Sequence, residues 1–236
     1  MNLTAELSQL IDQLEPIARP GGQGRALMVM GSRPGAGAST VARELARLAA
    51  LRSQRGVWLY DLDFAANAQS RAARVQGPAF DAALGRDPFW ALQTGNGRAR
   101  IVARQSVVAN LFVTELQTEP GALQGVALRA APDYWTAVRQ SIDLAIIDAP
   151  SQSTAPLNLA ADLDGVILVA DARDPNGAGL LARRAAIEAR GGVVAGLILN
   201  RTARIALGAR RRGRIYGSRT VSLLPGLDRA VVCAVR

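Results

Sequence analysis

The sequence predicts an α/β fold: a doubly wound, mainly parallel sheet with helices on both faces. Five apolar runs, rich in β-branched residues and closed by Gly, Asp, Pro or Asn, have the length of buried strands. Helical patterns alternate with them, and strands that are apolar on both sides are typical of parallel sheets covered on both faces. With 236 residues, 49% of them hydrophobic, the chain is long enough for one well-buried core. We therefore expect residues 1–236 to form a single domain.

The N-terminal quarter predicts a helix followed by a strand, a loop, a helix and a second strand. The opening run MNLTAELSQLIDQLEP is acidic and amphipathic, so we assign residues 1–24 to an N-terminal amphipathic helix and linker. Residues 26–30, ALMVM, form a short apolar run that a glycine closes. Residues 39–54 place a valine and several leucines near helical spacing, with arginines opposite, and the run GVWLYDLD at 56–63 predicts the second strand.

The rest of the chain continues this alternation, with a less regular middle. Region 67–133 is interrupted by Gly and Pro residues and contains one strand candidate, SVVANLFVTE at 106–115. We therefore expect irregular α/β structure within the same domain. We treat residues 201–236 as a basic C-terminal segment. The remaining predicted strands are 144–150, 165–172 and 193–200, and the helical candidates between them are 155–161 and 179–190.

Composition excludes several kinds of chemistry. All 28 basic residues are arginine, and the absence of histidine excludes a histidine general base and a histidine-ligated zinc site. The one cysteine, Cys233, cannot form an internal disulfide. No apolar stretch approaches the roughly 20 residues that span a bilayer, and the acidic N-terminus differs from a secretion signal. We therefore expect a cytoplasmic protein.

The net charge of +9 allows two explanations. It suits an acidic partner such as nucleic acid or anionic lipid, but alanine- and arginine-rich usage also follows from genomic base composition, which we favour. Residues 201–219 hold seven arginines and no acid, so contact with lipid headgroups, nucleic acid or an acidic partner stays open beside a solvated loop. Aromatic residues do not alternate with these arginines, as they do on surfaces that bind single-stranded nucleic acid. We therefore do not expect nucleic acid as a partner.

Polar residues follow the predicted strands at the point where each strand ends. In a doubly wound sheet, ligands bind beyond the carboxyl ends of the strands, so these residues should converge. Glycines, hydroxyls, carboxylates and an amide are the groups that a magnesium nucleotide needs, and we expect ATP or ADP with Mg²⁺ as ligands. The converging residues are GSRPGAGAST at 31–40, Asp61, Asp63, Asp148, Asn200 and Arg201.

The stretch GSRPGAGAST has the chemistry of a phosphate-binding loop. Gly35 and Gly37 let the backbone turn and point its N–H groups inward, and the helix that follows adds its positive N-terminal end. Ser39 or Thr40 would supply a hydroxyl to magnesium. An ordinary glycine-rich turn is the alternative, because such loops recur widely. The predicted nucleotide-binding residues are Arg33, Gly35, Ala36, Gly37, Ala38, Ser39, Thr40, Asn200 and Arg201.

Ala38 stands where such a loop carries its lysine. A charge-assisted contact of this kind contributes roughly 1.5–3 kcal/mol, and losing one preorganised transition-state donor costs about 100- to 1000-fold in rate. Binding through the backbone can survive this loss, whereas fast phosphoryl transfer should not. Arg33 is the nearest substitute for the missing cation.

Three aspartates complete the predicted site. Asp61 and Asp63 lie two apart at a strand end, on the same side of the strand, and we predict them as the catalytic acids facing a metal-bound water or an outer phosphate. Asp148 follows four apolar residues, the pattern of a magnesium carboxylate in phosphate-loop proteins. A helix cap or a solvated turn is the alternative for each aspartate alone. The predicted metal ligands are Ser39, Asp61 and Asp148.

Taken in order, these motifs resemble the deviant Walker-A ATPases of the MinD/ParA superfamily of P-loop NTPases. The match is closest to the CpsD/CapB-type bacterial tyrosine kinases, which pair with polysaccharide co-polymerases in capsule and exopolysaccharide export, and the proline before the first glycine favours this branch. The resemblance covers residues 26–201. The motifs that carry it are SRPGAGAST, VWLYDLD, DLAIIDAPS, DLDGVILVAD and VVAGLILNR.

The resemblance also assigns roles to the predicted residues. It implies that the loop from Gly35 to Thr40 holds phosphates and magnesium and that Asp61 and Asp63 are the second-motif acids. By the same resemblance, Asp148 is the Walker-B acid, and Asn200 and Arg201 lie near the adenine.

The sequence departs from the kinase pattern at several points. Ala38 replaces the Walker lysine, and Phe64 and Ala65 follow the second motif where the kinases usually have an arginine. The N-terminal region lacks the Glu-Arg-Arg helix used for ring assembly, and the tail offers only Tyr216 in place of a tyrosine cluster. The missing lysine and the missing substrate tail argue independently against autokinase activity.

The resemblance therefore implies a catalytically degenerate, tyrosine-kinase-like P-loop protein. We expect it to act as a cytoplasmic regulator or scaffold in capsule, exopolysaccharide or holdfast-type polysaccharide biosynthesis and export, docking on an inner-membrane co-polymerase of the Wzz type. A position peripheral to the inner membrane, contact with an anionic membrane surface and homo-oligomerisation are further expectations. Two alternatives stay open: a slow but active ATPase or tyrosine kinase that uses Arg33 in place of lysine, and a MinD/ParA-like positioning protein acting on membrane, cell pole or DNA.

Overall fold

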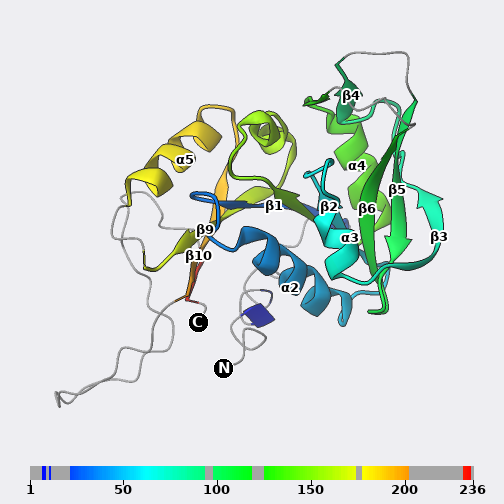
Figure 1. Ribbon diagram of the computed structural model, residues 1–236, viewed down its shortest axis with the longest axis horizontal. Helices are drawn as coiled ribbons and strands as arrows, with labels where there is room; N and C mark the ends of the chain where they lie inside the picture. The colour runs from blue at the N-terminus through cyan, green and yellow to red at the C-terminus, as the bar shows by residue number, and fades with distance from the viewer. Residues whose placement is uncertain are drawn as a thin grey trace.

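A nine-stranded sheet forms the centre of the molecule in the computed structural model (Figure 1). The structure describes residues 7, 8, 11, 22–93, 98–118, 125–173, 177–201 and 231–234, the last four as backbone only. The strands of this sheet are β1 (Arg25–Gly31), β2 (Val57–Asp61), β3 (Gln76–Asp81), β5 (Ala99–Gln105), β6 (Leu111–Thr118), β8 (Leu144–Ala149), β9 (Gly165–Asp171), β10 (Val194–Asn200) and β11 (Val231–Ala234).

The remaining elements flank this sheet. Strands β4 (Trp90–Leu92) and β7 (Val126–Leu128) pair with each other in a small antiparallel sheet. The helices are α2 (Ala38–Ala50), α3 (Ala68–Ala72), α4 (Pro132–Ser141), the 3₁₀ helix η1 (Ala155–Asp162) and α5 (Ala178–Glu188). None of the described helices combines the length and apolar character that crossing a lipid bilayer requires.

The strand order confirms the doubly wound, mainly parallel sheet. The order is β11-β10-β9-β1-β8-β2-β6-β5-β3, and every neighbouring pair from β11 to β6 runs parallel. Only β5 and β3 add to the far edge in antiparallel fashion. Because β1 lies between β9 and β8, the loop that follows β1 emerges at the middle of the carboxyl edge of the sheet.

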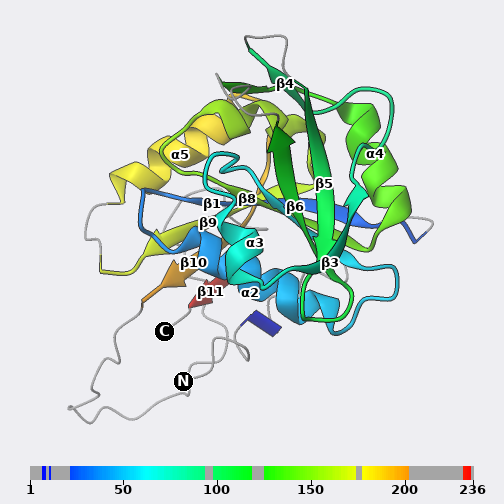
Figure 2. The same cartoon turned by 45° about the vertical axis from the view of Figure 1, so that its right-hand side comes forward.

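Helices cover both faces of the sheet, as the views in Figures 1 and 2 show. Along β1, Met28 and Met30 face a core shared with α4, η1 and α5, while Leu27 and Val29 face a second core built with α2. This alternation follows from the two-residue period of a strand, and it explains why the strand is apolar throughout. Leu7 and Ile11 are helical and buried in the α2 core.

Most of the predicted elements match the structure, and the middle region differs. Region 67–133 holds α3, β3 to β7 and the start of α4, and it lengthens the main sheet by β6, β5 and β3. The strand predicted at 106–115 begins only at Leu111, because the residues before it form a turn. In that turn the Ser106 amide donates to the Leu111 carbonyl at 2.8 Å, and Asn110 has φ +61°. The helix predicted at 155–161 is a 3₁₀ helix.

Parts of the two terminal assignments lie outside the described residues. Within the predicted N-terminal helix and linker at 1–24, the structure describes residues 7, 8, 11 and 22–24. Within the basic segment at 201–236, it describes Arg201 and the backbone of β11. The arginine-rich stretch that follows Arg201 lies outside the described residues, and so does Tyr216. The roles that we assign to them therefore stay predictions from sequence.

Candidate nucleotide site

The predicted loop surrounds a cavity of about 240 Å³ at the carboxyl edge of the sheet. The loop leaves β1 and enters α2, and its first turn is fixed to the neighbouring strand by the Ser32 amide, which donates to the Val169 carbonyl at 2.8 Å. The cavity is lined by Arg33, Gly35, Ala36, Gly37, Ala38, Ser39, Thr40, Asp63, Asp148, Ala149, Pro150, Ser151, Gln152 and Arg201.

The loop backbone has the conformation that an anion site needs. Gly35 and Gly37 have φ of +76° and +92°, in the left-handed region that glycine favours. Gly37 is the N-cap of α2, and no side chain caps the helix or places an acid in its first turn. The amides of the first turn of a helix lack partners within the helix, so this end of α2 offers N–H groups and positive potential to an anion.

Two side chains from the end of β10 hold the loop from behind. Asn200 Nδ2 donates to the Ala36 carbonyl at 2.8 Å, and Arg201 Nη1 donates to the Gly35 carbonyl at 2.7 Å. A Cβ on Gly37 would lie 2.2 Å from Asn200 Nδ2, so the contact requires glycine at this position. Both residues were expected near an adenine, and in the structure they brace the loop backbone, with Arg201 also lining the cavity.

Ser39 and Asp148 meet at the inner end of the cavity. Ser39 Oγ donates to Asp148 Oδ1 at 3.1 Å. Gln69 lies behind the pair, and its Nε2 donates to Asp148 Oδ2 at 2.6 Å and to the Ser39 carbonyl at 2.9 Å. Arg43 donates in turn to Gln69 Oε1 at 3.1 Å. A hydroxyl beside a carboxylate is the arrangement by which phosphate-loop proteins hold Mg²⁺, so Ser39 and Asp148 fit that ion.

Asp61 and Asp63 separate into two environments. Asp63 lines the cavity, whereas Asp61 is 2% exposed and lies beside Asp148 on the adjacent strand. The Asp61 carboxylate accepts hydrogen bonds from the amides of Asp63 at 3.0 Å and Gln69 at 2.9 Å. Of the two predicted catalytic acids, only Asp63 therefore contacts the cavity.

Burial shifts the pKa of both inner carboxyls upward. It raises the pKa of Asp61 to about 6, against the opposing effect of the two amide hydrogen bonds, and the nearby Asp148 charge adds to the rise. Burial also raises the pKa of Asp148, although hydrogen bonds from Gln69 and Ser39 oppose it. A divalent cation bound beside these carboxyls would favour their ionised form.

Three arginines converge on Asp171 at the rim of the cavity. The Asp171 carboxylate, whose side chain is inaccessible to solvent, pairs with Arg173 at 2.7 Å, Arg201 at 2.9 Å and Arg33 at 3.4 Å. Hydrogen bonds from the Arg173 side chain and amide lower the pKa of Asp171 most, and Arg201 adds to the effect. Two of these arginines, Arg33 and Arg201, also line the cavity.

Sequence reasoning missed several residues of this site. Asp171 closes a predicted strand, so the rule that identified Asp61 and Asp148 could have found it. Ser151 and Gln152 follow the end of β8 and could have been found in the same way. Gln69 lies on α3 within the irregular middle region, and no motif in the sequence marks it.

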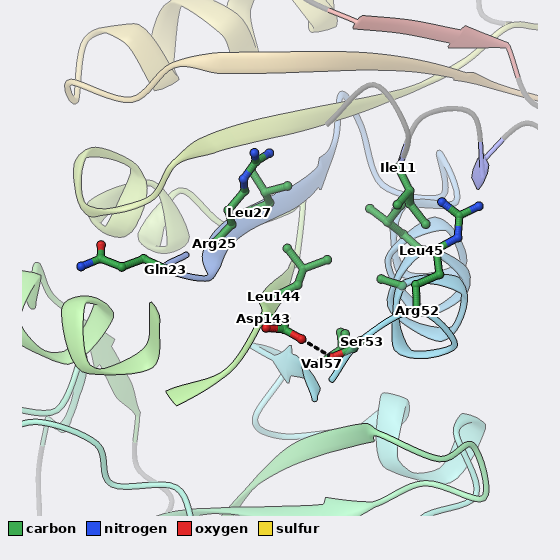
Figure 3. Close-up of a pocket in the computed structure, with 11 residues that line it drawn as sticks. Ile11, Gln23, Arg25, Leu27, Leu45, Arg52, Ser53, Val57, Asp143 and Leu144 are labelled. Carbon is green, nitrogen blue, oxygen red and sulfur yellow. Dashed lines mark hydrogen bonds between the residues drawn. The ribbon is translucent and has the colours of Figure 1, made fainter. Parts of the chain in front are cut away.

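A second cavity, of about 280 Å³, lies at the opposite edge of the sheet, where β1, β2 and β8 begin (Figure 3). Its walls are mainly aliphatic and include Leu27, Leu45 and Leu144. Its one carboxylate, Asp143, accepts hydrogen bonds from Ser53 Oγ and from the amide and guanidinium of Arg55. Burial opposes these bonds, yet they lower the pKa of Asp143 to about 2. This carboxylate therefore joins the turn between α2 and β2 to the start of β8.

The predicted metal ligands of the first cavity do not form a carboxylate cage. Among the described residues, no three His, Cys, Asp or Glu side chains gather as a metal-binding group. A cation at Ser39 and Asp148 would therefore share its coordination with phosphate oxygens of a ligand, as Mg²⁺ commonly does.

Comparisons with known proteins reveal likeness in structure only. The sequence matches no protein family model and no curated protein. The kinase domain of the Escherichia coli tyrosine kinase ETK superposes with a TM-score of 0.63 at 17% identity, over 89% of this chain and 80% of that one. The VpsO kinase domain gives 0.56 at 19% identity, over 86% of this chain and 100% of that one.

MinD-like proteins give a similar result. The septum site-determining protein MinD of Pyrococcus horikoshii, in complex with Mg-ADP, superposes with a TM-score of 0.57 at 18% identity, over 77% of this chain and 72% of that one. Identities this low establish shared architecture and leave activity open. The chain therefore has the doubly wound P-loop fold of the MinD-like ATPases and the bacterial tyrosine kinase domains, as the sequence motifs predicted.

Proposed function

We propose that this protein binds a magnesium nucleotide through the backbone of its phosphate loop and transfers the phosphoryl group slowly or not at all. The observation that carries the proposal is the Ser39–Asp148 pair beside the uncapped N-terminus of α2. These groups supply a cation site and an anion site next to each other, which is what a polyphosphate with Mg²⁺ requires. The MinD relative of this fold was solved with Mg-ADP, which supports the same ligand class here.

The proposed lack of rapid turnover rests on Ala38. This residue lines the cavity at the first position of α2, and its methyl group can neither donate a hydrogen bond nor carry a charge. Positive charge near the cavity comes from arginines on its rim, which are already paired with Asp171. A transition state that develops charge on the outer phosphate would lack the donor at position 38, and losses of this kind cost about 100- to 1000-fold in rate.

Calorimetric titration with ADP and ATP, with and without Mg²⁺, tests the binding proposal. We expect binding of both nucleotides and a gain in affinity on adding Mg²⁺. Ser39→Ala should remove that gain, because it deletes the hydroxyl, while Ser141→Ala on α4 serves as the matched control away from the cavity. No binding of either nucleotide at millimolar concentration would overturn the proposal.

The rate of ATP hydrolysis distinguishes the catalytically degenerate protein that we propose from the alternative, a slow but active ATPase or kinase. Wild-type hydrolysis should be close to the buffer background, and Ala38→Lys should raise it, because the new ammonium group would lie on the cavity wall. Robust hydrolysis by the wild type, lost on Arg33→Gln, would favour the active alternative that uses Arg33.

For the cellular role, we propose a cytoplasmic regulator or scaffold that docks on an inner-membrane polysaccharide co-polymerase of the Wzz type. The support is the order of the sequence motifs together with the fold shared with the ETK and VpsO kinase domains. Co-purification with the cytoplasmic segments of a co-polymerase encoded nearby would test this role. Binding to anionic vesicles or to DNA, without binding to the co-polymerase, would favour a positioning protein instead.

A further inference from the structure

The arginine cluster on Asp171 differs from an ordinary surface ion pair in two ways. Its carboxylate is inaccessible to solvent, and it pairs with three guanidinium groups, more than one carboxylate can neutralise. Two of the three arginines, Arg33 and Arg201, lie on the wall of the cavity beside the predicted phosphate loop. The cluster therefore presents excess positive charge to a group that enters the cavity.

The three arginines are held to different degrees. Arg173 contacts both carboxylate oxygens, at 2.9 and 2.7 Å, and its amide donates to the same group at 3.0 Å. Arg201 divides its Nη1 donors between Asp171 and the Gly35 carbonyl, so it also shapes the loop. Arg33 makes the longest contact with Asp171, at 3.4 Å, and its side chain is 46% exposed. Among the three, Arg33 therefore makes the weakest contact with Asp171.

We propose that Asp171 is an anion built into the site that competes with the outer phosphate of a bound ligand for the Arg33 guanidinium. This inference rests on the proposed nucleotide binding. In the structure Asp171 holds Arg33 at the rim of the cavity. When a ligand with two or more phosphates enters, its outer phosphate carries more charge than one carboxylate and takes the Arg33 guanidinium, while Arg173 and Arg201 keep Asp171 paired.

The proposal specifies the class of ligand. A diphosphate or triphosphate group can occupy the amides at the start of α2 and reach the rim together, whereas a single phosphate fills only the first of these positions. Affinity should therefore be higher for ADP and for inorganic pyrophosphate than for AMP and inorganic phosphate. Arg33 should account for much of that difference.

Calorimetry with ADP, AMP, pyrophosphate and phosphate, all with Mg²⁺, tests the proposal. Arg33→Gln should weaken ADP and pyrophosphate about tenfold or more, the scale of one charge-assisted hydrogen bond, and should change AMP little. Asp171→Asn should tighten ADP and pyrophosphate roughly three- to tenfold, because it removes the competing charge. In the double variant Arg33→Gln/Asp171→Asn the gain in affinity from Asp171→Asn should disappear, because the arginine for which Asp171 competes is gone. Arg100→Gln on β5, which removes the same charge far from the cavity, is the control.

The outcomes separate this inference from the function on which it rests. If the wild type binds neither ADP nor pyrophosphate, the proposed function fails and the inference fails with it. If the wild type binds ADP but Arg33→Gln binds it equally well, only the inference fails. Weaker binding by Asp171→Asn, with an unchanged circular dichroism spectrum, would also overturn it, because Asp171 would then aim the arginines and not compete for them.

Discussion

Asp61 and Asp143 both accept hydrogen bonds from backbone amides, yet their surroundings shift their pKa in opposite directions. Asp61 is deeply buried beside Asp148 and has no basic partner among its hydrogen bonds, so burial dominates and raises its pKa to about 6. Asp143 is partly exposed and bonded to the Arg55 guanidinium, so its hydrogen bonds outweigh the effect of burial and its pKa falls to about 2. An ionised aspartate thus lowers the stability of the fold at one edge of the sheet, as Asp61, and raises it at the other, as Asp143.

This difference predicts how stability depends on pH. Because the folded pKa of Asp61 lies above its ordinary value of 3.8, its favourable contribution is complete below pH 3.8 and is lost as the pH rises through about 6. The loss amounts to at most about 3 kcal/mol, and Asp148 acts in the same direction. Asp143 acts oppositely: its stabilisation is present above pH 3.8 and is lost as the pH falls through about 2.

Urea unfolding at several values between pH 4 and pH 7 measures the effect. The free energy of unfolding of the metal-free protein should carry a component that declines across this interval, and Asp61→Asn should reduce that decline. The substitution also replaces one acceptor oxygen with an NH2 group, so either the Asp63 or the Gln69 amide loses its acceptor. The change of slope with pH is therefore the informative quantity, and not the absolute stability. An unchanged slope in Asp61→Asn would contradict the raised pKa.

Gln69 connects more parts of the site than any residue that the sequence motifs predicted. Its amide group bonds Asp148, the Ser39 carbonyl and Arg43, and its backbone amide bonds Asp61. Gln69→Leu keeps the approximate volume but removes the side-chain bonds to Asp148 Oδ2 and to the Ser39 carbonyl, and each buried group left unpaired costs about 1–3 kcal/mol. We expect a loss of stability in that range or above it in urea unfolding. Gln54→Leu, at an exposed position, should change stability little, and equal effects at both positions would contradict this account.

At the scale of elements, the loop between β1 and α2 depends on the end of β10 as well as on its own glycines. Gly35 and Gly37 have similar positive φ, but their surroundings differ. A Cβ on Gly35 would meet nothing within 4 Å, whereas one on Gly37 would collide with Asn200 Nδ2. The amide that fixes the Ala36 carbonyl thus also excludes any side chain at Gly37.

Two alanine substitutions separate these effects. Gly35→Ala introduces only the backbone strain of an alanine in the left-handed region, which lowers stability by something on the order of 1 kcal/mol. This variant should keep much of the nucleotide affinity. Gly37→Ala must also displace Asn200, which frees the Ala36 carbonyl and alters the loop, so nucleotide binding should fall well below that of Gly35→Ala. Calorimetry with Mg-ADP on both variants measures the difference. Equal affinities would show that Asn200 does not hold the loop in its binding conformation.

For the whole molecule, the sequence predicted the central strands and the edge of the sheet at which the candidate site lies. Buried parallel strands are apolar on both sides, so β1, β8 and β9 stood out as continuous runs, and the polar residues at their ends converged as the topology requires. Strands β3 and β5 at the sheet edge carry exposed and charged residues, so they lack such a pattern. Gln69 and the pairing of Asp171 with Arg33 depend on contacts between distant segments, which local patterns do not encode.

Ligand binding at one edge should stabilise the entire molecule, because the cavity is built from the ends of β1, β8 and the neighbouring segments that form its central sheet. Mg-ADP at 100 times its Kd should add about 2.7 kcal/mol to the free energy of unfolding, a rise in Tm of roughly 5–10 °C for a domain of this size. Trp135 is buried among Tyr60, Phe89 and Tyr134 on the α4 side of the sheet, outside the cavity lining. Tryptophan fluorescence and far-UV circular dichroism should therefore report the same rise, with AMP giving a smaller one. A rise in only one of the two signals would show that the site and the aromatic core unfold separately.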